Sequence, residues 1–256
     1  MSKDNLKRNI LVTNALPYAN GSLHLGHMLE HIQSDIWVRF QKLINNNCTY
    51  VCGEDAHGTS IMLKAEERGI KPEELIKSVK ESHIEDLKAF NINYDNFYTT
   101  HSEENKFLSE MIFSQLQEKD LIEEKEIEQL FDTEKNLFLS DRYVKGTCPS
   151  CNAKEQYGDN CESCSSAYSA IDLIDPVSVL SDSKPEIRKS IHLFFKLSKL
   201  RKSIKEWLET SKVPKQAVNK LSEWTEGEIK DWDISRDGPY FGFEIPGYPN
   251  KFFYVW

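Results

Sequence analysis

Residues 9–43 read NILVTNALPYANGSLHLGHMLEHIQSDIWVRFQKL, and this stretch decides the fold. Its first five residues are rich in β-branched side chains, which predicts a buried strand. The residues LPYANG that follow are a turn signal. From His27 onward, apolar residues recur at intervals of three and four, which predicts a helix. A strand, a glycine-containing loop and a helix, in this order, open an α/β nucleotide-binding domain.

The composition of the 256 residues is that of an ordinary globular protein, with 39% hydrophobic and 29% charged residues. The N-terminus is not a secretory signal, and no apolar run has the length of a membrane span. We therefore expect a cytoplasmic protein with no membrane partner. The net charge of −9 is unusual for a protein that binds nucleic acid over its whole surface. Residues 196–205 form a local basic patch, which is either an RNA-docking surface or, as we favour, the solvated face of a helix.

The motif His24-Leu-Gly-His27 lies where the loop becomes the helix. Residues three apart share one helix face. The helix N-terminus adds free N–H groups and a positive dipole end, which favour phosphate. Gly26 would let a bulky ligand approach the backbone closely. The motif alone is a weak signal, since an accidental pair or a metal-binding pair would look the same.

Further elements follow along the chain. We expect a strand at 49–52, a helix through Ile61 and Ala65, and another helix that begins at Pro72. Thr100 and Glu103 have capping-box spacing ahead of the next helix. Residues 186–224 are expected to be largely helical, and residues 251–256 form a strand.

Four of the six cysteines form the pattern C-x2-C, nine intervening residues, C-x2-C. They are Cys148, Cys151, Cys161 and Cys164. Two such pairs aim four thiolates at one ion, which predicts a closed, structural zinc site. Disulfides and an iron–sulfur cluster are the alternatives, although a cytosolic protein rarely keeps disulfides. Cys48 and Cys52 fall outside the pattern and are expected to be small buried hydrophobic residues.

Three stretches of the chain resemble the methionyl-tRNA synthetase family of class I aminoacyl-tRNA synthetases. Residues 15–27 resemble the first class I signature, and Leu16-Pro17-Tyr18 is the tripeptide of the methionine members. The stretches 54–58 and 232–237 resemble two further parts of that family, and the likeness runs from Ile10 to Trp256. It implies methionine–tRNA ligase activity, in which ATP and L-methionine form methionyl-adenylate before transfer to the 3′ end of tRNA(Met). The implied cofactors are one structural Zn²⁺ and the Mg²⁺ that accompanies ATP, and the implied nucleic acid is tRNA rather than DNA.

The resemblance also implies the domains and the site residues. The fold would be α/β, with an incomplete Rossmann-like catalytic domain at 1–118 and 231–256 and a zinc-binding connective insertion at 119–230. The catalytic residues would be His24 and His27. The ATP-binding residues would be Pro17, His24, Gly26 and His27. The methionine-binding residues would be Ala15, Leu16, Tyr18, Asp55 and Trp256.

Three of the methionine-binding candidates also have a plain structural interpretation. Tyr18 would be a turn residue, Asp55 a helix cap and Trp256 a core residue. Asp55 is the strongest of them, because a buried carboxylate needs a cationic partner such as the methionine ammonium. His101 lies in a polar loop that we expect to border the pocket.

The sequence also departs from the family. It contains no Lys-Met-Ser-Lys-Ser stretch, the second class I signature. We therefore expect a truncated or partial chain with doubtful turnover of its own. The alternatives to the ligase are a catalytically incomplete fragment and a zinc-dependent RNA-binding module.

Overall fold

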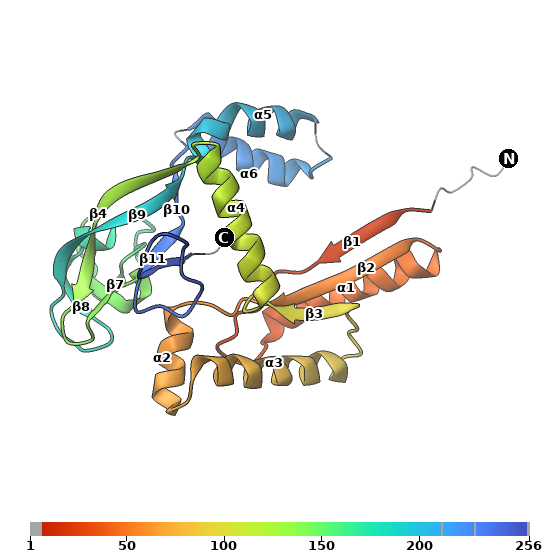
Figure 1. Cartoon of the computed structure of the whole chain (residues 1–256), viewed down its shortest axis with the longest axis horizontal. Helices are drawn as coiled ribbons and strands as arrows, with labels where there is room; N and C mark the ends of the chain where they lie inside the picture. The colour runs from red at the N-terminus through yellow and green to blue at the C-terminus, as the bar shows by residue number, and fades with distance from the viewer. Residues whose placement is uncertain (1–6, 211, 228, 255–256) are drawn as a thin grey trace. The chain divides into compact units, whose positions relative to one another are not determined.

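The computed structural model describes residues 7–210, 212–227 and 229–254. The chain divides into two compact units (Figure 1). Unit 1 comprises Met1–Ser109 with Tyr240–Gly242, and unit 2 comprises Glu110–Pro239 with Phe243–Trp256. The predicted domain boundaries at 118/119 and 230/231 stay predictions. Within the described residues, no helix is both long enough and apolar enough to cross a membrane.

Unit 1 is built on a three-stranded parallel sheet with the order β1-β2-β3 (Figure 1). The strands are β1 (Asn9–Thr13), β2 (Asn47–Glu54) and β3 (Asn96–Thr99). Helix α1 (Leu25–Leu43) connects β1 to β2, and helices α2 (Thr59–Arg68) and α3 (Pro72–Ala89) connect β2 to β3. The predicted strands and helices of this region are confirmed, and so is the α/β class.

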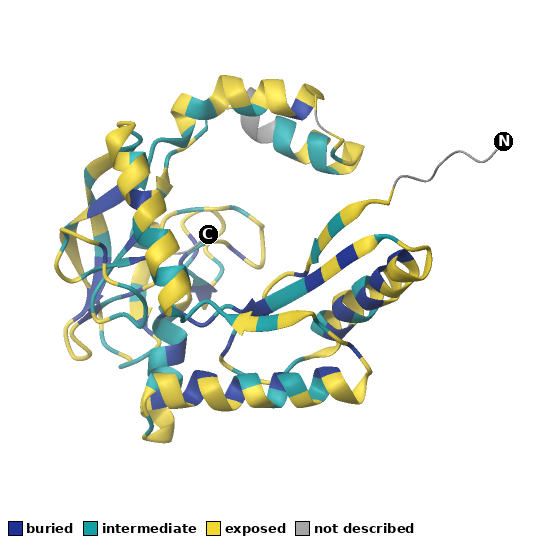
Figure 2. Cartoon of the chain, turned by 45° about the vertical axis from the view of Figure 1, so that its right-hand side comes forward, coloured by how far each residue is buried: buried dark blue, intermediate teal, exposed yellow. Residues whose placement is uncertain are grey.

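Helix α3 shows how the sequence fixes a buried face. Pro72 occupies the first turn, where its missing N–H costs nothing. The stripe that faces inward recurs every four residues, and dark blue bands alternate with yellow along the helix in Figure 2. The stripe consists of Leu75, Val79, His83 and Leu87. Two apolar clusters pack beneath it, one of them with Ala19, Ala56 and Ile61 at its centre.

Helix α1 buries a different face from the one its apolar residues mark. Its buried side chains include the polar His31, Asp35 and Gln41. Several of its apolar residues are exposed, among them Leu29, Ile36, Phe40 and Leu43. Helical periodicity therefore located this helix correctly but did not identify the face that packs on the sheet.

Helix α4 (Glu103–Glu118) begins where the sequence predicted, but its cap differs. The predicted N-cap, Thr100, is wrong. The Ser102 hydroxyl accepts the backbone N–H of Asn105 at 3.2 Å. The Thr100 hydroxyl instead accepts the N–H of Ala56 at 2.8 Å, and so ties the loop after β3 to the loop after β2. Thr100 and Ser102 both carry a hydroxyl, but that of Thr100 is already used to hold the two loops together.

Unit 2 contains an antiparallel sheet with the order β10-β9-β4-β5. Its strands are β4 (Ile122–Asp132), β5 (Leu137–Phe138), β9 (Glu186–Phe195) and β10 (Trp232–Asp233). The predicted helix over 186–224 is therefore wrong in its first part. Residues 186–195 pair with β4 over ten positions, from Ile122 opposite Phe195 to Phe131 opposite Glu186. Helices α5 (Arg201–Thr210) and α6 (Lys215–Glu226) occupy only the later part of that range.

Smaller elements complete unit 2. The strands are β6 (Val144–Thr147), β7 (Gln156–Tyr157), β8 (Ile174–Ser178), β11 (Ser235–Asp237) and β12 (Lys251–Phe253). The 3₁₀ helices are η1 (Asp141–Tyr143), η2 (Ala170–Asp172) and η3 (Leu197–Leu200). Strands β7, β6 and β8 form one sheet, and β11 pairs with β12. The strand predicted at 251–256 is confirmed over Lys251–Phe253, and residues 255 and 256 lie outside the described part.

Candidate functional site

Two histidines open helix α1. Nδ1 of His24 accepts hydrogen bonds from the backbone N–H groups of Gly26 at 3.1 Å and His27 at 3.4 Å. The backbone N–H of His24 donates in return to Nδ1 of His27 at 3.3 Å. The two imidazoles thus cap the helix reciprocally, as in a capping box. Their rings stack with centroids 3.6 Å apart and an interplanar angle of 17°.

This capping fixes the tautomers of the two rings. Because both Nδ1 atoms accept backbone hydrogen bonds, the proton of each neutral ring is on Nε2. Burial and the neighbouring His24 lower the pKa of His27, so His27 is neutral at pH 7. The helix start therefore offers two imidazole N–H donors beside the positive end of its dipole. Such an arrangement suits an anion.

Gly26 lies under this pair of rings. A Cβ built at Gly26 would come within 3.0 Å of Cε1 and 3.1 Å of Nδ1 of His24. Real Cβ atoms rarely approach a neighbour so closely, so a side chain at this position would displace the imidazole. The glycine is thus needed for the placement of His24, a reason that differs from the close ligand approach inferred from the sequence.

Backbone hydrogen bonds join the loop before α1 to the end of β2. The N–H of Asp55 donates to the carbonyl of Pro17 at 3.0 Å, and the N–H of Ala19 donates to the carbonyl of Asp55 at 2.8 Å. Pro17 is buried, so in this chain its visible role is to hold the loop. The N–H of Ala15 donates to Glu30 of α1 at 2.7 Å. The structure thus brings the predicted residues 15–27 and Asp55 together at the carboxyl edge of the sheet, where α/β proteins bind ligands.

Asp55 carries a partly buried carboxylate at this edge. Its burial raises its pKa, although a hydrogen bond from the His57 backbone N–H opposes the shift. A carboxylate that is costly to ionise in its surroundings gains most from a cationic partner. The hydroxyl of Tyr18 accepts from Ser60 at 2.7 Å. A Cβ on Gly58 would come within 2.5 Å of that hydroxyl, which explains the glycine.

A hollow of about 450 Å³ lies at the carboxyl ends of β1, β2 and β3. Its lining includes Leu16, Cys52, Tyr98 and Leu108. Of the predicted methionine-binding residues, only Leu16 lines it. Cys52 was expected to be buried and is only partly so, while Cys48 is buried as expected. Trp256, also predicted for this pocket, lies outside the described residues.

Two further histidine contacts near this site were missed in the sequence. Nε2 of His57 lies 3.0 Å from Nδ1 of His101, and the His101 ring stacks on Phe241 with centroids 4.9 Å apart. Burial and the neighbouring His101 lower the pKa of His57 to about 4. Nδ1 of His83 lies 2.9 Å from Oε1 of Glu54. The available signal for His83 was its position, since it interrupts an otherwise apolar helical stripe.

The four cysteines of unit 2 converge as predicted. Their Sγ atoms all lie within 4.8 Å of one another. The Sγ–Sγ distance is 3.9 Å for Cys148 and Cys164 and 3.6 Å for Cys151 and Cys161. Thiolates bound at about 2.3 Å to one tetrahedral zinc would stand about 3.8 Å apart. The distances fit a shared metal and are too long for disulfides. This group can therefore hold a structural metal ion.

The two cysteine pairs have matching backbones. In the first knuckle, the N–H of Cys148 donates to Ala153 and that of Asn152 donates to Cys148. In the second knuckle, the corresponding N–H groups of Cys161 and Ser165 donate to Ser166 and Cys161. Asn152 and Ser165 both have left-handed backbones, with φ of 61° and 60°. Each C-x2-C pair thus brings its own turn.

Hydrogen bonds favour the thiolate form that metals require at Cys148 and Cys164, whereas the neighbouring thiols raise the pKa of Cys151 to about 12. Burial opposes ionisation of Cys148, but the backbone N–H groups of Cys151 and Ser150 lower its pKa to about 6. The hydroxyl of Ser166 lies 3.0 Å from Sγ of Cys164 and, with its backbone N–H, lowers the pKa of that thiol. Ser166 is a supporting residue that the cysteine spacing did not reveal.

A buried charged network surrounds the stretch 232–237 in unit 2. The ring of His192 on β9 is 1% exposed, with Nδ1 2.7 Å from Asp233 and Nε2 2.9 Å from Asp237. Burial would lower the pKa of His192, but the two carboxylates outweigh burial and raise it. Arg236 forms an ion pair with Asp233 at 3.0 Å, and its guanidinium lies over the ring of Tyr254.

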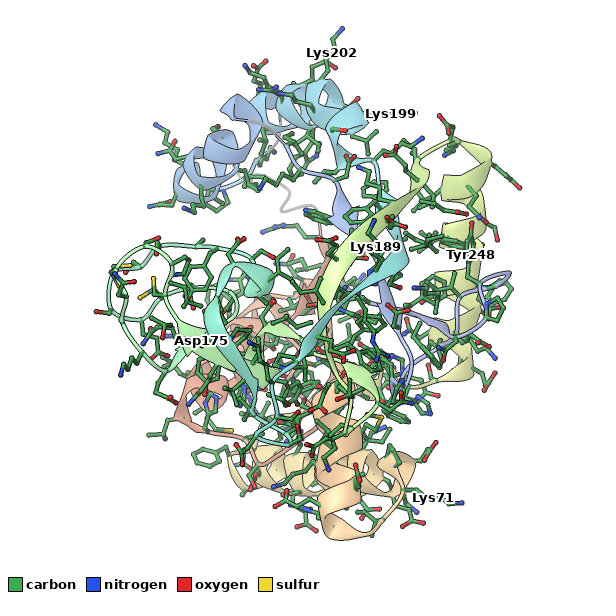
Figure 3. The ribbon with its side chains drawn as sticks, turned by 90° about the vertical axis from the view of Figure 1, so that its left-hand side faces the viewer. Lys71, Asp175, Lys189, Lys199, Lys202 and Tyr248 are labelled. Atoms are coloured by element: carbon green, nitrogen blue, oxygen red, sulfur yellow. The ribbon has the colours of Figure 1, made fainter. Side chains whose placement is uncertain are left out.

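The basic patch at 196–205 is largely neutralised or solvated. Lys196 and Lys199 both form ion pairs with Asp120, at 3.0 and 2.7 Å. The side chain of Lys202, labelled beside Lys199 in Figure 3, extends away from the ribbon. These contacts support a solvated helix face.

Comparison with known proteins covers nearly the whole chain. Residues 10–256 match the family described as tRNA synthetases class I (M). Two solved structures of Mycobacterium tuberculosis methionyl-tRNA synthetase, both with methionyl-adenylate bound, are similar in fold. Each has a TM-score of 0.72 and 19% sequence identity, over 98% of this chain and 45% of the other. The chain thus spans less than half the length of these structures.

Proposed function

This chain belongs to the class I (M) tRNA synthetase family, and from that premise we propose that the full-length protein containing it is a methionine–tRNA ligase. It would activate L-methionine with ATP and transfer the methionyl group to tRNA(Met). One observation carries the proposal, namely the stacked pair of capping imidazoles at the start of α1, preceded by a loop whose backbone is joined to Asp55. A cytoplasmic location belongs to the same proposal.

His24 and His27 would bind the triphosphate. Since backbone N–H groups occupy both Nδ1 atoms, both Nε2–H groups are left to donate to phosphate oxygens. Donors fixed on a rigid helix start need no rearrangement as charge develops in the transition state, which is what electrostatic catalysis requires. Gly26 maintains this geometry, and Pro17 holds the loop on β2.

Asp55 would bind the methionine ammonium. The ammonium would provide a positive partner for this partly buried carboxylate, whose burial makes it costly to ionise alone. Leu16 and Tyr18 would shape the slot for the thioether, and Ala15 would form its backbone edge. Trp256 stays a proposal from the sequence resemblance.

The reaction would then be a displacement at the α-phosphorus of ATP. A carboxylate oxygen of methionine forms a bond to this phosphorus, and the bond to the pyrophosphate leaving group breaks. The product is methionyl-adenylate. Phosphoryl chemistry of this kind depends on positioning and electrostatics, with Mg²⁺ neutralising the phosphates. The tRNA 3′ hydroxyl would afterwards attack the methionyl carbonyl and release AMP.

The four cysteines would hold one Zn²⁺ with a structural role. Four thiolates leave no open coordination position, so the ion would hold the two knuckles together rather than act on the substrate. An RNA-binding role for this module finds little support, because two lysines of the basic patch at 196–205 already form ion pairs with Asp120.

Methionine-dependent ATP–pyrophosphate exchange by the full-length protein tests the proposal. Asp55→Asn should raise the KM for methionine by about a hundredfold, because the ammonium loses a charge-assisted hydrogen bond worth roughly 2–3 kcal/mol. The KM for ATP should stay within about twofold. Glu81→Gln, which removes an exposed carboxylate from α3, is the matched control. An unchanged methionine KM would remove Asp55 from the site, and the absence of exchange in the wild-type protein would refute the proposed activity.

A further inference from the structure

His83 is a charged residue in a place that should be apolar. It lies on the inward stripe of α3 between Val79 and Leu87, and its side chain is fully buried. Glu54, at the end of β2, is fully buried as well. Burying an ionisable side chain costs several kcal/mol unless it has a partner. The two residues therefore require a structural explanation that core packing alone does not give.

The contacts of His83 define its protonation. Nε2 lies 2.7 Å from the carbonyl oxygen of Gly21, which can only accept, so Nε2 carries a proton. Nδ1 lies 2.9 Å from Oε1 of Glu54, which is within ion-pair distance but without hydrogen-bond geometry. A carbonyl and a carboxylate thus face the two ring nitrogens, and the doubly protonated imidazolium is the form that suits both. Burial would lower the pKa of His83, but Glu54 and the Gly21 carbonyl outweigh it and raise the pKa.

The contact of His83 with Gly21 lies in the middle of the loop before α1, between the segment bonded to the end of β2 and the start of the helix. Up to Ala19, the loop is joined to the β2 end by the backbone bonds of Asp55. From His24 onward, the chain is held by helix α1. The carbonyl of Gly21 lies between these two segments, and His83 anchors it from α3. Glu54, which holds the other side of the ring, is the direct neighbour of Asp55.

We propose that His83 is a positioning residue: paired with Glu54, its imidazolium anchors the Gly21 carbonyl and thereby fixes the loop that presents His24 and His27 to the triphosphate. The anchoring rests on geometry alone, and its importance for ATP rests on the function proposed above. Titratable groups on three elements face the ring. They are Glu54 at the end of β2, Asp86 on α3, and His27 and His31 on α1, whose pKa values His83 helps to lower.

The anchor has a defined pH dependence. The pKa of His83 is raised above its value of about 6.5 in an unfolded chain. Its stabilising contribution is therefore complete below pH 6.5 and is lost as the pH rises through the raised pKa. Above that pH, the lone pair of Nδ1 faces the Glu54 carboxylate, and the ring loses its support.

Two variants separate anchoring from charge. In Glu54→Gln, a neutral His83 still donates from Nε2 to Gly21, while Nδ1 accepts from the new amide. The pKa of His83 should fall, and the anchor should remain. In His83→Phe the anchor is lost, and Glu54 is left buried without its partner. The double variant Glu54→Gln/His83→Phe also loses the anchor but leaves no buried carboxylate without a partner. It therefore replaces His83→Phe in the test if that single variant unfolds. His192→Gln removes another buried histidine, which pairs with two carboxylates of unit 2, and serves as the control.

NMR of the 256-residue chain gives the first readout. Below pH 6.5, both nitrogens of His83 should be protonated. The backbone amide resonances of His24, Gly26 and His27 should shift in the two His83→Phe variants, and they should stay in place in Glu54→Gln and His192→Gln. Unmoved loop resonances in the His83→Phe variants would overturn the proposal.

Exchange kinetics of the full-length protein give the second readout. The His83→Phe variants should raise the KM for ATP by roughly tenfold or more, since small displacements of positioning groups cost this much. The KM for methionine should change by less than about twofold. Equal increases of both constants would indicate a general structural role and overturn the proposal. If the wild-type protein shows no exchange but the loop resonances still shift, the anchor stands and the proposed function fails.

Discussion

The cysteine knuckles of unit 2 and the histidine loop of unit 1 are both built on turns, but they obtain their geometry differently. Each knuckle carries its own backbone turn, and all four thiols lie within 17 consecutive residues. The histidine loop is held by residues from β2, α1 and α3 that are distant in sequence. A site within one short segment can be recognised from the spacing of its residues alone. For a site assembled from distant segments, the sequence indicates the ligand-binding residues but not the residues that support them. The two sites should therefore fail in different ways.

The largest effect is expected from Cys161→Ser in the knuckles. Cys161 is buried within the cluster, and a structural zinc site of this type contributes roughly 10 kcal/mol to the folding of its domain at neutral pH. Elemental analysis should find about one zinc per chain in the wild-type protein. The variant should contain no zinc. Cys48→Ser, a buried cysteine outside the cluster, should keep the metal. A metal-free wild-type protein with an intact knuckle fold would contradict the structural role of the metal.

A smaller effect of about 3 kcal/mol is expected from the titration of His57 in unit 1. Its pKa of about 4 lies below the unfolded value of about 6.5, so the unfolded chain binds more protons between these values. The free energy of unfolding should therefore fall as the pH drops from 6.5 to 4. This slope is measured by denaturant unfolding at several pH values and should be absent in His57→Gln.

His192 of unit 2 provides the opposite sign for the same measurement. Its raised pKa means that its contribution is complete below pH 6.5 and is lost as the pH rises through that pKa. The difference between wild type and His192→Gln should accordingly shrink at high pH, while that for His57→Gln changes at low pH. Equal pH dependences for the two variants would show that the buried histidines do not differ as described.

The smallest effect is expected from Gly26→Ala in the histidine loop. The added Cβ would displace the ring of His24, so ATP affinity of the full-length protein should fall by about tenfold, or roughly 1.4 kcal/mol. Thermal stability should change little, because alanine favours the helix by about 1 kcal/mol. Ser22→Ala, an exposed loop change, is the control. An alanine variant that binds ATP normally would show that the loop tolerates a moved imidazole.

The sequence predicted the elements of unit 1 well because strand, turn and helix signals there agree with the packing. It failed at β9, which was predicted to be the first part of a helical stretch. Residues 186–195 become a strand only because β4, about sixty residues earlier, offers a complete antiparallel partner. No local signal reports such a partner, and tertiary pairing overrides local propensity.

The same limit explains which site residues were found. The spacing of the cysteines and the His-x-x-His motif are local, and both were predicted. The pairs of His83 with Glu54, and of His192 with Asp233 and Asp237, join residues on different elements. A histidine in an apolar stripe signals a buried partner but does not identify it. The prediction of Thr100 as the N-cap was wrong for a related reason, because its hydroxyl accepts the backbone N–H of Ala56, which is distant in sequence.

Sulfur atoms of opposite knuckles lie close together in the cysteine cluster. Cys148 lies 3.9 Å from Cys164, and Cys151 lies 3.6 Å from Cys161. An oxidant that reaches these thiols before a metal ion does would remove two electrons from each pair and join one knuckle covalently to the other. Once both pairs were oxidised, the chain would have a nearly correct shape but no thiolates left to bind an ion. Handling under air without metal would therefore lock the protein into an inert form that only a reductant could reverse.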